Sequence, residues 1–235
     1  MIKPVYKRVI IKLSGEALAG EKGSGIDGKV LNKVVDQIIE IKKLGVEIGI
    51  VVGAGNFWRG RQGTDMDRTT ADHMGMLATL MNALAIQDAC ESKGVQTRVQ
   101  AALTITRVAE PYILRKALTH FEKGRIVIFA CGTGNPYFTT DTAAALRAAE
   151  IGADVLLLAK NVDGIYDSDP KLNKNAKKLD KVSYKEYIER SLKAMDTTAI
   201  TMCMENEIPV LAFGLFEKDA LLRAVSGENI GTLIK

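Results

Sequence analysis

The chain has 235 residues, of which 47% are hydrophobic and 26% are charged, an ordinary composition for a globular protein. A chain of this length buries a large core without staples, and we interpret residues 1–235 as a single domain. The net charge of +4 is too small to indicate nucleic acid as an obligatory partner. Three scattered cysteines and two histidines provide neither a disulfide framework nor a zinc site.

The ends and the apolar runs of the chain indicate its compartment. Residues 1–7 are not followed by the long apolar run of a signal peptide. No apolar stretch reaches the roughly 18 residues that a membrane span needs. We therefore expect a cytoplasmic protein without a membrane partner.

Strand-like and helical patterns alternate along the chain. Apolar runs rich in Val and Ile predict strands at 8–13, 46–52, 95–99, 125–130, 154–158, 208–213 and 231–234. Helical spacing of apolar residues predicts helices at about 31–44, 72–92, 140–150, 196–206 and 217–225. This alternation is typical of an α/β fold, with a mainly parallel sheet covered by helices on both sides. The polar segment 160–182 is predicted to be a long surface loop, and such loops are often functional.

Three predicted strands end in small residues followed by polar or cationic ones. These turns are Lys12-Leu13-Ser14-Gly15, the segment 53–61 beginning Gly53-Ala54-Gly55, and the segment 132–141. In an open α/β sheet, ligands bind at the carboxyl ends of the strands. We therefore expect the three turns to form one crevice that binds a polyphosphate. The competing interpretation is that they are ordinary capped turns.

Two glycine-rich motifs do not fit their context. Gly23-Ser24-Gly25-Ile26-Asp27-Gly28 matches a dinucleotide fingerprint, but the preceding predicted strand ends about ten residues earlier. The overlapping Walker A match has Val30 where that loop needs Ser or Thr. A flexible loop ahead of a helix explains both motifs better.

The expected crevice contains the parts that phosphoryl transfer needs, which are charge neutralisation and alignment. Lys12 at a strand end can reach the transferring group, and Arg59 can clamp a phosphate. Asp141 either holds Mg²⁺ or positions Lys12. Asp72 and Asp196 stand at predicted helix starts, so each is either a functional carboxylate or an N-cap.

Four motifs together resemble the bacterial uridylate (UMP) kinases of the amino-acid kinase superfamily, and the similarity spans essentially the whole chain. The motifs are Lys12-Leu13-Ser14-Gly15-Glu16-Ala17-Leu18, the segment 53–60, Asp72-His73-Met74-Gly75-Met76-Leu77-Ala78-Thr79 and the segment 133–141. The segment 162–166, Asp169-Pro170 and the segment 231–234 match as well. The resemblance implies a three-layer αβα sandwich of the amino-acid kinase type and transfer of phosphate from ATP to UMP.

The resemblance also implies a role for individual residues. It places Lys12, Arg59, Asp141 and Asp196 in catalysis. It places Lys12, Leu13, Ser14, Gly15, Gly55, Arg59, Asn161, Tyr166 and Asp169 at ATP. It places Ala54, Arg59, Asp72, Thr133, Gly134, Asn135, Pro136, Tyr137, Phe138, Thr139 and Thr140 at UMP. The UMP-binding part is then mainly 45–150, and the ATP-binding part is mainly 151–235 with the turn 12–15.

Partners and effectors follow from the same resemblance. The family uses Mg²⁺ with ATP, forms homohexamers and is typically regulated by GTP and inhibited by UTP. Gly20, Glu21, Lys22, Gly23, Ser24 and Gly25 match the part associated with the GTP response. Ala54 replaces a glycine that many relatives have, and a methyl group there requires a negative φ.

Other functions remain open at this point. A kinase of the same superfamily acting on a carboxylate or carbamate would have little use for a ribose-reading acid at Asp72. A non-catalytic nucleotide sensor or nucleic-acid-binding regulator would not need Lys12, Arg59 and Asp141 together. An oxidoreductase is already disfavoured by the context of the glycine fingerprint.

Overall fold

The protein is built on one large sheet, as the computed structural model shows for residues 3–58, 65–168, 172–173 and 175–235. Its strands are β1 (Arg8–Leu13), β2 (Glu47–Val52), β3 (Thr97–Ala101), β4 (Glu110–Pro111), β5 (Ile126–Ala130), β6 (Val155–Lys160), β9 (Lys181–Val182), β10 (Val210–Gly214) and β11 (Thr232–Ile234). The nine strands lie in the order β4-β3-β5-β2-β1-β6-β10-β11-β9. Neighbouring strands are parallel except β10 and β11, which are antiparallel.

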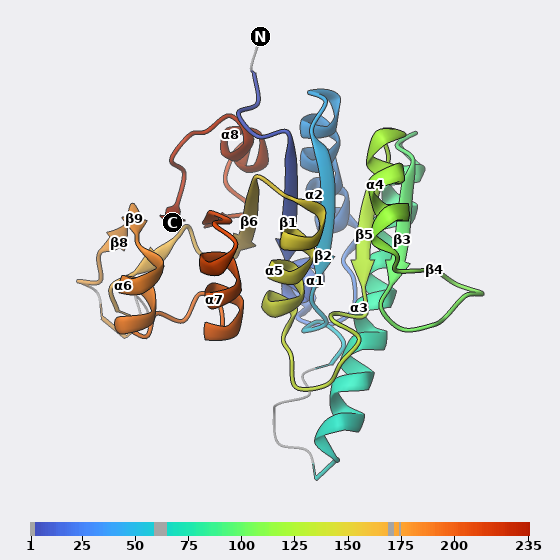
Figure 1. The fold of residues 1–235 in the computed structure, drawn as a ribbon, viewed down its shortest axis with the longest axis horizontal. Helices are drawn as coiled ribbons and strands as arrows, with labels where there is room; N and C mark the ends of the chain where they lie inside the picture. The colour runs from blue at the N-terminus through green and yellow to red at the C-terminus, as the bar shows by residue number, and fades with distance from the viewer. Residues whose placement is uncertain (1–2, 59–64, 169–171, 174) are drawn as a thin grey trace.

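Helices cover both faces of the sheet (Figure 1). One layer holds α1 (Gly15–Ala19), the 3₁₀ turn η1 (Gly20–Lys22), α2 (Gly28–Lys43), α3 (Arg68–Glu91) and α8 (Ala220–Val225). The other holds α4 (Leu114–Glu122), α5 (Thr140–Ile151), α6 (Tyr184–Glu189) and α7 (Thr197–Glu205). Each layer closes its own apolar core against the sheet. The predicted three-layer αβα sandwich is confirmed.

The alternation of side chains along the central strands decides which lysines face which layer. In β1, Val9 and Ile11 pack in the core under α2 and α3, whereas Ile10 packs in the core under α5. Since successive side chains of a strand point to opposite faces, Lys12 follows Ile10. In β6, Lys160 follows Leu158 to that same face. Two lysines of neighbouring strands therefore point toward the layer of α5 and α7.

The strand order reverses at β1, because β2 lies on one side of it and β6 on the other. Such a reversal leaves a crevice outside the carboxyl ends of the strands, where open α/β sheets bind ligands. The turns after β1, β2, β5 and β6 all lie at this edge, since these strands are parallel. The fold thus brings the three predicted turns together.

Several predicted elements change in extent. Helix α3 begins at Arg68 instead of residue 72, because Asp67 caps it by accepting a hydrogen bond from Thr70 N at 3.0 Å. The expectation that Asp72 stands at a helix start was therefore wrong. Strand β3 begins at Thr97, two residues later than predicted.

The polarity of the segment 160–182 predicted a long surface loop, but the segment also contains short strands. It contains the hairpin of β7 (Ile165–Tyr166) and β8 (Lys178–Leu179), and then β9 at the edge of the large sheet. The short elements β4, α4 and α6 were also missed by the sequence analysis.

Two negative expectations can be compared with the fold. The glycine motif 23–28 follows η1 and precedes α2, so it does not connect a strand to a helix. In the part of the chain that the structure describes, no helix has the length and apolar character to cross a bilayer.

Candidate active site

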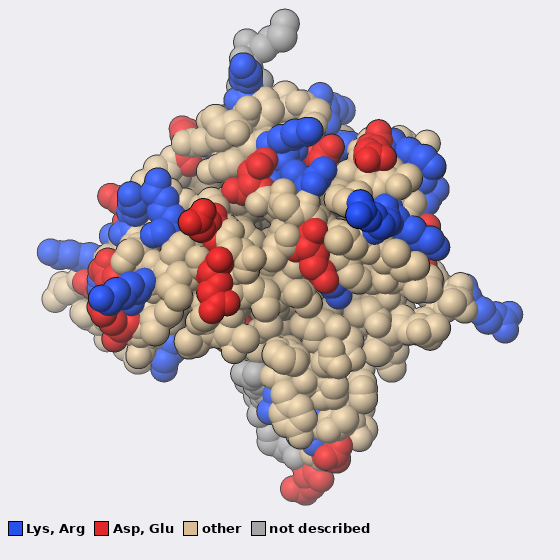
Figure 2. Space-filling model, viewed as in Figure 1, with Lys and Arg blue, Asp and Glu red and all other residues tan. Residues whose placement is uncertain are grey.

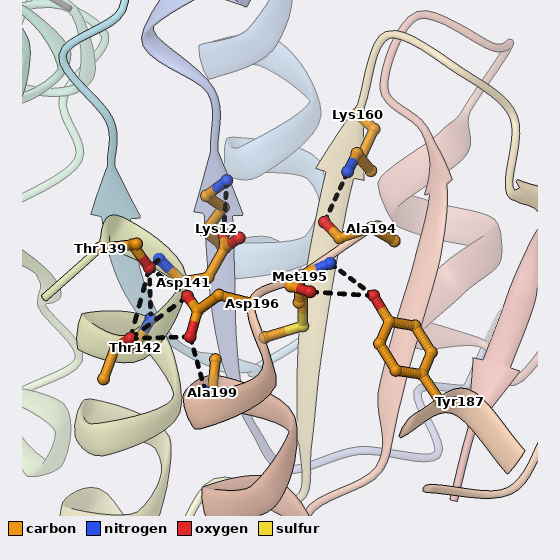
Figure 3. Close-up of polar contacts among 10 residues, drawn as sticks. All are labelled: Lys12, Thr139, Asp141, Thr142, Lys160, Tyr187, Ala194, Met195, Asp196 and Ala199. Carbon is orange, nitrogen blue, oxygen red and sulfur yellow. Dashed lines mark hydrogen bonds and ion pairs between the residues drawn. The ribbon is translucent and has the colours of Figure 1, made fainter. Parts of the chain in front are cut away.

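An ion pair lies at the centre of the crevice. Lys12 Nζ at the end of β1 is 2.7 Å from Asp141 Oδ1 in the first turn of α5. Both side chains are mostly buried, with 15% and 18% of their surface exposed. Of the two roles considered for Asp141, the structure therefore shows contact with Lys12 (Figure 3).

Asp196 ties α7 to α5 beside this pair. Its carboxylate accepts hydrogen bonds from the hydroxyl of Thr139 and, at 3.2 Å, from the hydroxyl of Thr142. It also accepts from Ala199 N at 3.0 Å and so caps α7. Asp196 is thus an N-cap that also belongs to the polar cluster around α5 (Figure 3).

Lys160 is a second cation at this edge, and the sequence analysis missed it. Its Nζ donates to the carbonyl oxygen of Ala194 at 2.6 Å, two residues before Asp196 (Figure 3). Burial, followed by the charge of Lys12, lowers the pKa of Lys160 below its ordinary value. A bound anion would offset both the burial of the Lys160 charge and its repulsion by Lys12, so this pair of lysines is a candidate anion-binding site. Lys160 stands two residues after the apolar Leu158, and this alternation along the strand was the sequence signal that could have revealed its side chain at the site.

The turns after β1 and β2 are in direct contact. A Cβ on Gly15 would lie 2.5 Å from Asn56 Oδ1 and 2.6 Å from the carbonyl oxygen of Gly53. Glycine is therefore required at position 15 for steric reasons. Ala54 does not adopt a positive φ, so its methyl group causes no backbone strain. The carbonyl of the buried Leu13 accepts from Gly53 N at 2.9 Å, and Ser14 stands at the N-cap of α1.

A first hollow of about 280 Å³ opens between α3 and the turns after β2 and β5. Its lining combines small, polar and aromatic side chains: Ala54, Trp58, Ala71, Asp72, Gly75, Met76, Thr79, Gly132, Thr133, Asn135, Phe138, Thr139 and Thr140. Most residues predicted at UMP therefore border one cavity. Gly134, Pro136 and Tyr137 belong to the same turn without lining it.

Asp72 links α3 to the turn after β5. Its Oδ2 accepts from Tyr137 N at 2.7 Å and from Arg68 Nε at 2.8 Å. The Arg68 guanidinium also lies 5.1 Å from the centre of the Tyr137 ring. Tyr137 and Cys131 have positive φ values of 72° and 63°, which are uncommon for residues other than glycine and often occur at functional sites.

A second hollow, of about 520 Å³, lies on the other side of the cluster. Its lining comes from β6, the β7–β8 hairpin and the segment before α7: Lys160, Val162, Gly164, Ile165, Tyr166, Asp167, Ser168, Leu172, Arg190, Ser191, Leu192, Lys193 and Ala194. Tyr166, predicted at ATP, borders it, whereas Asn161 is exposed beside it.

Hydrogen bonds hold the hairpin at this hollow. Tyr166 donates its hydroxyl to Asp163 Oδ1 at 2.8 Å, and Lys178 Nζ lies 3.1 Å from Asp163 Oδ2. Although partial burial acts to raise it, these two contacts lower the pKa of Asp163. The carboxylate therefore stays charged and keeps the hairpin in place.

The other residues predicted at ATP, UMP or GTP border neither hollow or lie outside the described residues. Arg59 and Asp169 lie outside the described residues. Gly55 packs against Glu16, whose Cγ would be 2.9 Å from a Cβ at position 55. The segment 20–25 is mostly exposed, and Gly25 N donates to the carbonyl of Asn56 at 2.9 Å.

The charges on the surface do not form a continuous basic area on the face shown in Figure 2, where Lys and Arg are interspersed with Asp and Glu. A nucleic-acid interface would need such an area. Among the residues that the structure describes, no group of three or more His, Cys, Asp or Glu side chains could hold a metal ion by itself.

Known proteins match this chain over nearly its full length. The model of the amino acid kinase family matches residues 7–213. The chain belongs to the amino acid kinase family. It is therefore a kinase, and its large sheet with helices on both faces is the fold of that family.

The solved structures similar to this amino acid kinase include three uridylate kinases. UMP kinase from Bacillus anthracis is 39% identical with a TM-score of 0.95, covering 98% of this chain and 96% of its own. UMP kinase from Ureaplasma parvum is 39% identical with a TM-score of 0.92, covering 100% of both chains. Uridylate kinase from Archaeoglobus fulgidus is 27% identical with a TM-score of 0.73, covering 97% and 99%. The resemblance to bacterial UMP kinases is confirmed.

Proposed function

We propose that this kinase transfers the γ-phosphoryl group of ATP directly to UMP, forming UDP and ADP. The observation that carries the proposal is the placement of the Lys12–Asp141 pair. Thr139 and Thr140, which border the first hollow, immediately precede Asp141. Lys160 and Ala194 border the second hollow and are hydrogen-bonded to each other. Ala194 lies two residues before Asp196, which contacts the start of α5 beside the Lys12–Asp141 pair. A cation between two cavities suits the transfer of a phosphoryl group from one ligand to the other.

The first hollow is assigned to UMP. Ala54 faces it from the turn after β2 and Asp72 faces it from α3, and the turn 133–140 borders or supports it. A carboxylate is a suitable acceptor for ribose hydroxyls, and the aromatic ring of Phe138 can stack on a base. Arg59 completes this assignment as the clamp on the UMP phosphate.

The second hollow is assigned to the adenine and ribose of ATP, with Asn161, Tyr166 and Asp169 on that side. Its larger volume and its apolar Val162, Ile165 and Leu192 suit a purine. The turn 12–15 and Gly55 then meet the ATP phosphates. The UMP-binding part is 45–150, and the ATP-binding part is 151–235 with that turn.

The reaction needs no general base. A nucleotide phosphate has a second pKa of about 6, so the attacking oxygen is already ionised near neutral pH. Lys12 neutralises charge that develops during transfer, and Asp141 holds Lys12 in place. Asp196 fixes the start of α5 through Thr139 and Thr142. Transfer is then in line, from the oxygen of ADP to the oxygen of UMP.

The residues present fit Mg²⁺ that enters with ATP. Magnesium usually keeps several waters and takes one or two carboxylates together with the phosphates of its nucleotide. Asp141 Oδ1 is buried next to Lys12 and makes no other hydrogen bond among the described residues. Asp141, paired with Lys12, would therefore contact such an ion through its waters. The ion would supply further charge neutralisation at the phosphates.

Two nucleotides, GTP and UTP, are expected to regulate the enzyme. We assign the GTP response to residues 20–25, because Gly25 is hydrogen-bonded to the turn that would meet the phosphates. The ratio of rates with and without GTP should fall in Lys22→Ala, and an unchanged ratio would contradict the assignment. UTP is expected to inhibit by occupying the UMP hollow, which competition with UMP would reveal.

We also propose a homohexamer. The exposed Met74, Leu77 and Met81 recur at helical spacing on α3, which indicates a face that a second copy covers. Light scattering should give six chains for the wild type and fewer for Leu77→Glu. A monomeric wild type would contradict the proposal.

The stereochemical course of transfer tests the proposed reaction. Incubation of UMP with ATP carrying a chiral γ-thiophosphoryl group should give labelled UDP with inverted configuration at phosphorus. Retention would contradict direct transfer, because it requires two successive displacements. Failure to label UDP under conditions in which the protein is folded would contradict UMP as the acceptor.

A further inference from the structure

Helix α3 carries two buried polar side chains under the crevice. Thr79 is 5% exposed and Asn82 is fully buried. They stand three residues apart and so lie on the same side of the helix. A buried polar group in a helix is costly unless it is hydrogen-bonded, and each of these two is bonded to a different turn.

Asn82 holds the turn after β2. Its Nδ2 donates to the carbonyl oxygen of Gly53 at 2.7 Å and to Asn56 Oδ1 at 2.8 Å. Its Oδ1 accepts from Asn56 Nδ2 at 2.9 Å, and that nitrogen also donates to the carbonyl of Gly25 at 2.7 Å. Because main-chain carbonyls only accept, Gly53 and Gly25 fix the orientation of both amides.

The bond to Gly53 determines the direction of the next peptide group. In a trans peptide the carbonyl of Gly53 and the N–H of Ala54 point in opposite directions. With that carbonyl held toward α3, the N–H of Ala54 is directed away from Asn82. Ala54 borders the first hollow, and Gly15 packs directly on the Asn56 amide. Asn82 therefore positions the turn after β2 directly and the turn after β1 through Asn56.

Thr79 holds the turn after β5. Its hydroxyl accepts from Cys131 N at 2.8 Å and donates to the carbonyl of Met76 at 2.7 Å. Cys131 has a φ of 63°, a conformation that non-glycine residues adopt when their surroundings impose it. The Thr79 hydroxyl is one such constraint at the point where the chain enters the turn 132–140.

We propose that Thr79 and Asn82 are positioning residues that place two separate turns of the active site from one helix. Although Thr79 itself borders the acceptor hollow, its hydroxyl is engaged by Cys131 N and the Met76 carbonyl, so it acts on the acceptor turn. Asn82 positions the turns that meet the transferring phosphate. This proposal rests on the proposed function. It predicts that the two residues affect different kinetic constants although they are neighbours on α3.

The test compares near-isosteric variants of the purified full chain. Thr79→Val removes the hydroxyl, Thr79→Ser keeps it, and Asn82→Asp removes both N–H donors. Thr79→Val should raise KM for UMP about fivefold or more, since of the two hydrogen bonds lost the one from Cys131 N positions the acceptor turn. KM for ATP should stay unchanged, and Thr79→Ser should restore KM for UMP. Asn82→Asp should instead lower kcat about tenfold or more, because small misplacements of reacting groups are costly.

Controls separate the outcomes. If Asn82→Asp does not fold, Asn82→Ser is measured instead, because it keeps one donor and leaves room for water. Variants that lower the melting temperature but keep wild-type kcat and KM would show a structural role only and overturn the proposal. Equal changes in all constants at both positions would overturn it as well. A wild type that forms no UDP would contradict the proposed function itself.

Discussion

Replacing Lys12 by Met removes the cation at the centre of the crevice while keeping the length of the side chain. At 2.7 Å from Asp141 and an effective dielectric constant near 20, the two charges attract by about 6 kcal/mol before desolvation is subtracted. A charge-assisted hydrogen bond to the transferring group contributes about 1.5–3 kcal/mol net. If that interaction is made only in the transition state, its loss lowers kcat by about 10- to 150-fold.

The assay is the initial rate of ADP release from ATP and Mg²⁺ with saturating UMP. Lys93→Met is the matched control, because Lys93 Nζ lies 2.6 Å from Asp36 Oδ1 on an exposed surface. Such a pair contributes only about 0–1 kcal/mol to stability, so we expect kcat to change little. Asp141→Asn combined with Lys12→Met should cost little more than the worse single variant, since the two act as a unit. A folded Lys12→Met enzyme with nearly native kcat would refute the reasoning.

Three further variants examine other parts of the site. Asp72→Asn should raise KM for UMP more than KM for ATP, because Asp72 borders the first hollow; a rise in KM for ATP alone would mean that the two nucleotide sites are exchanged. Burial and the charge of Lys12 lower the pKa of Lys160, so Lys160 loses its proton at a lower pH than an ordinary lysine, and kcat should decline at alkaline pH. In Lys160→Arg that decline should move to higher pH, and identical pH profiles would exclude Lys160 from it. Gly15→Ala should reduce activity and destabilise the fold by about 1–3 kcal/mol through overpacking, since its Cβ would lie 2.5 Å from Asn56 Oδ1. The control is Gly28→Ala, whose Cβ would meet nothing within 4 Å and which should leave the melting temperature and activity intact. Similar losses in both variants would show that the contact at position 15 is not the cause.

Much of the architecture could be predicted because it depends on local patterns. Central parallel strands are buried on both faces and read as continuous apolar runs, as in β1, β2, β5 and β6. Since parallel strands end at one edge, the turns after them had to meet there. Helix α6 has six residues and is too short for its periodicity to stand out. In α4, Leu114, Ala117, Leu118 and Phe121 follow helical spacing, a local signal that the sequence analysis overlooked.

The parts that the sequence did not reveal depend on contacts between distant segments. Asn82 and Thr79 are polar residues in a helix, and nothing local indicates that they are buried under two turns. Asp72 was expected near a helix start, but its contact with Tyr137 N depends on how the turn after β5 folds back onto α3. Lys160 is the exception, since alternation along β6 places it on the same face as Lys12.

The choice of acceptor tests the central claim most directly. ADP release from ATP and Mg²⁺ should be measured with UMP, CMP, dTMP, AMP, GMP, acetylglutamate and aspartate as acceptors under identical conditions. The arrangement of the two hollows around Lys12 and Asp141 predicts selective turnover of UMP. Turnover of an amino acid in place of UMP would contradict the assignment of the first hollow, and binding of UMP without turnover would contradict the proposed catalysis.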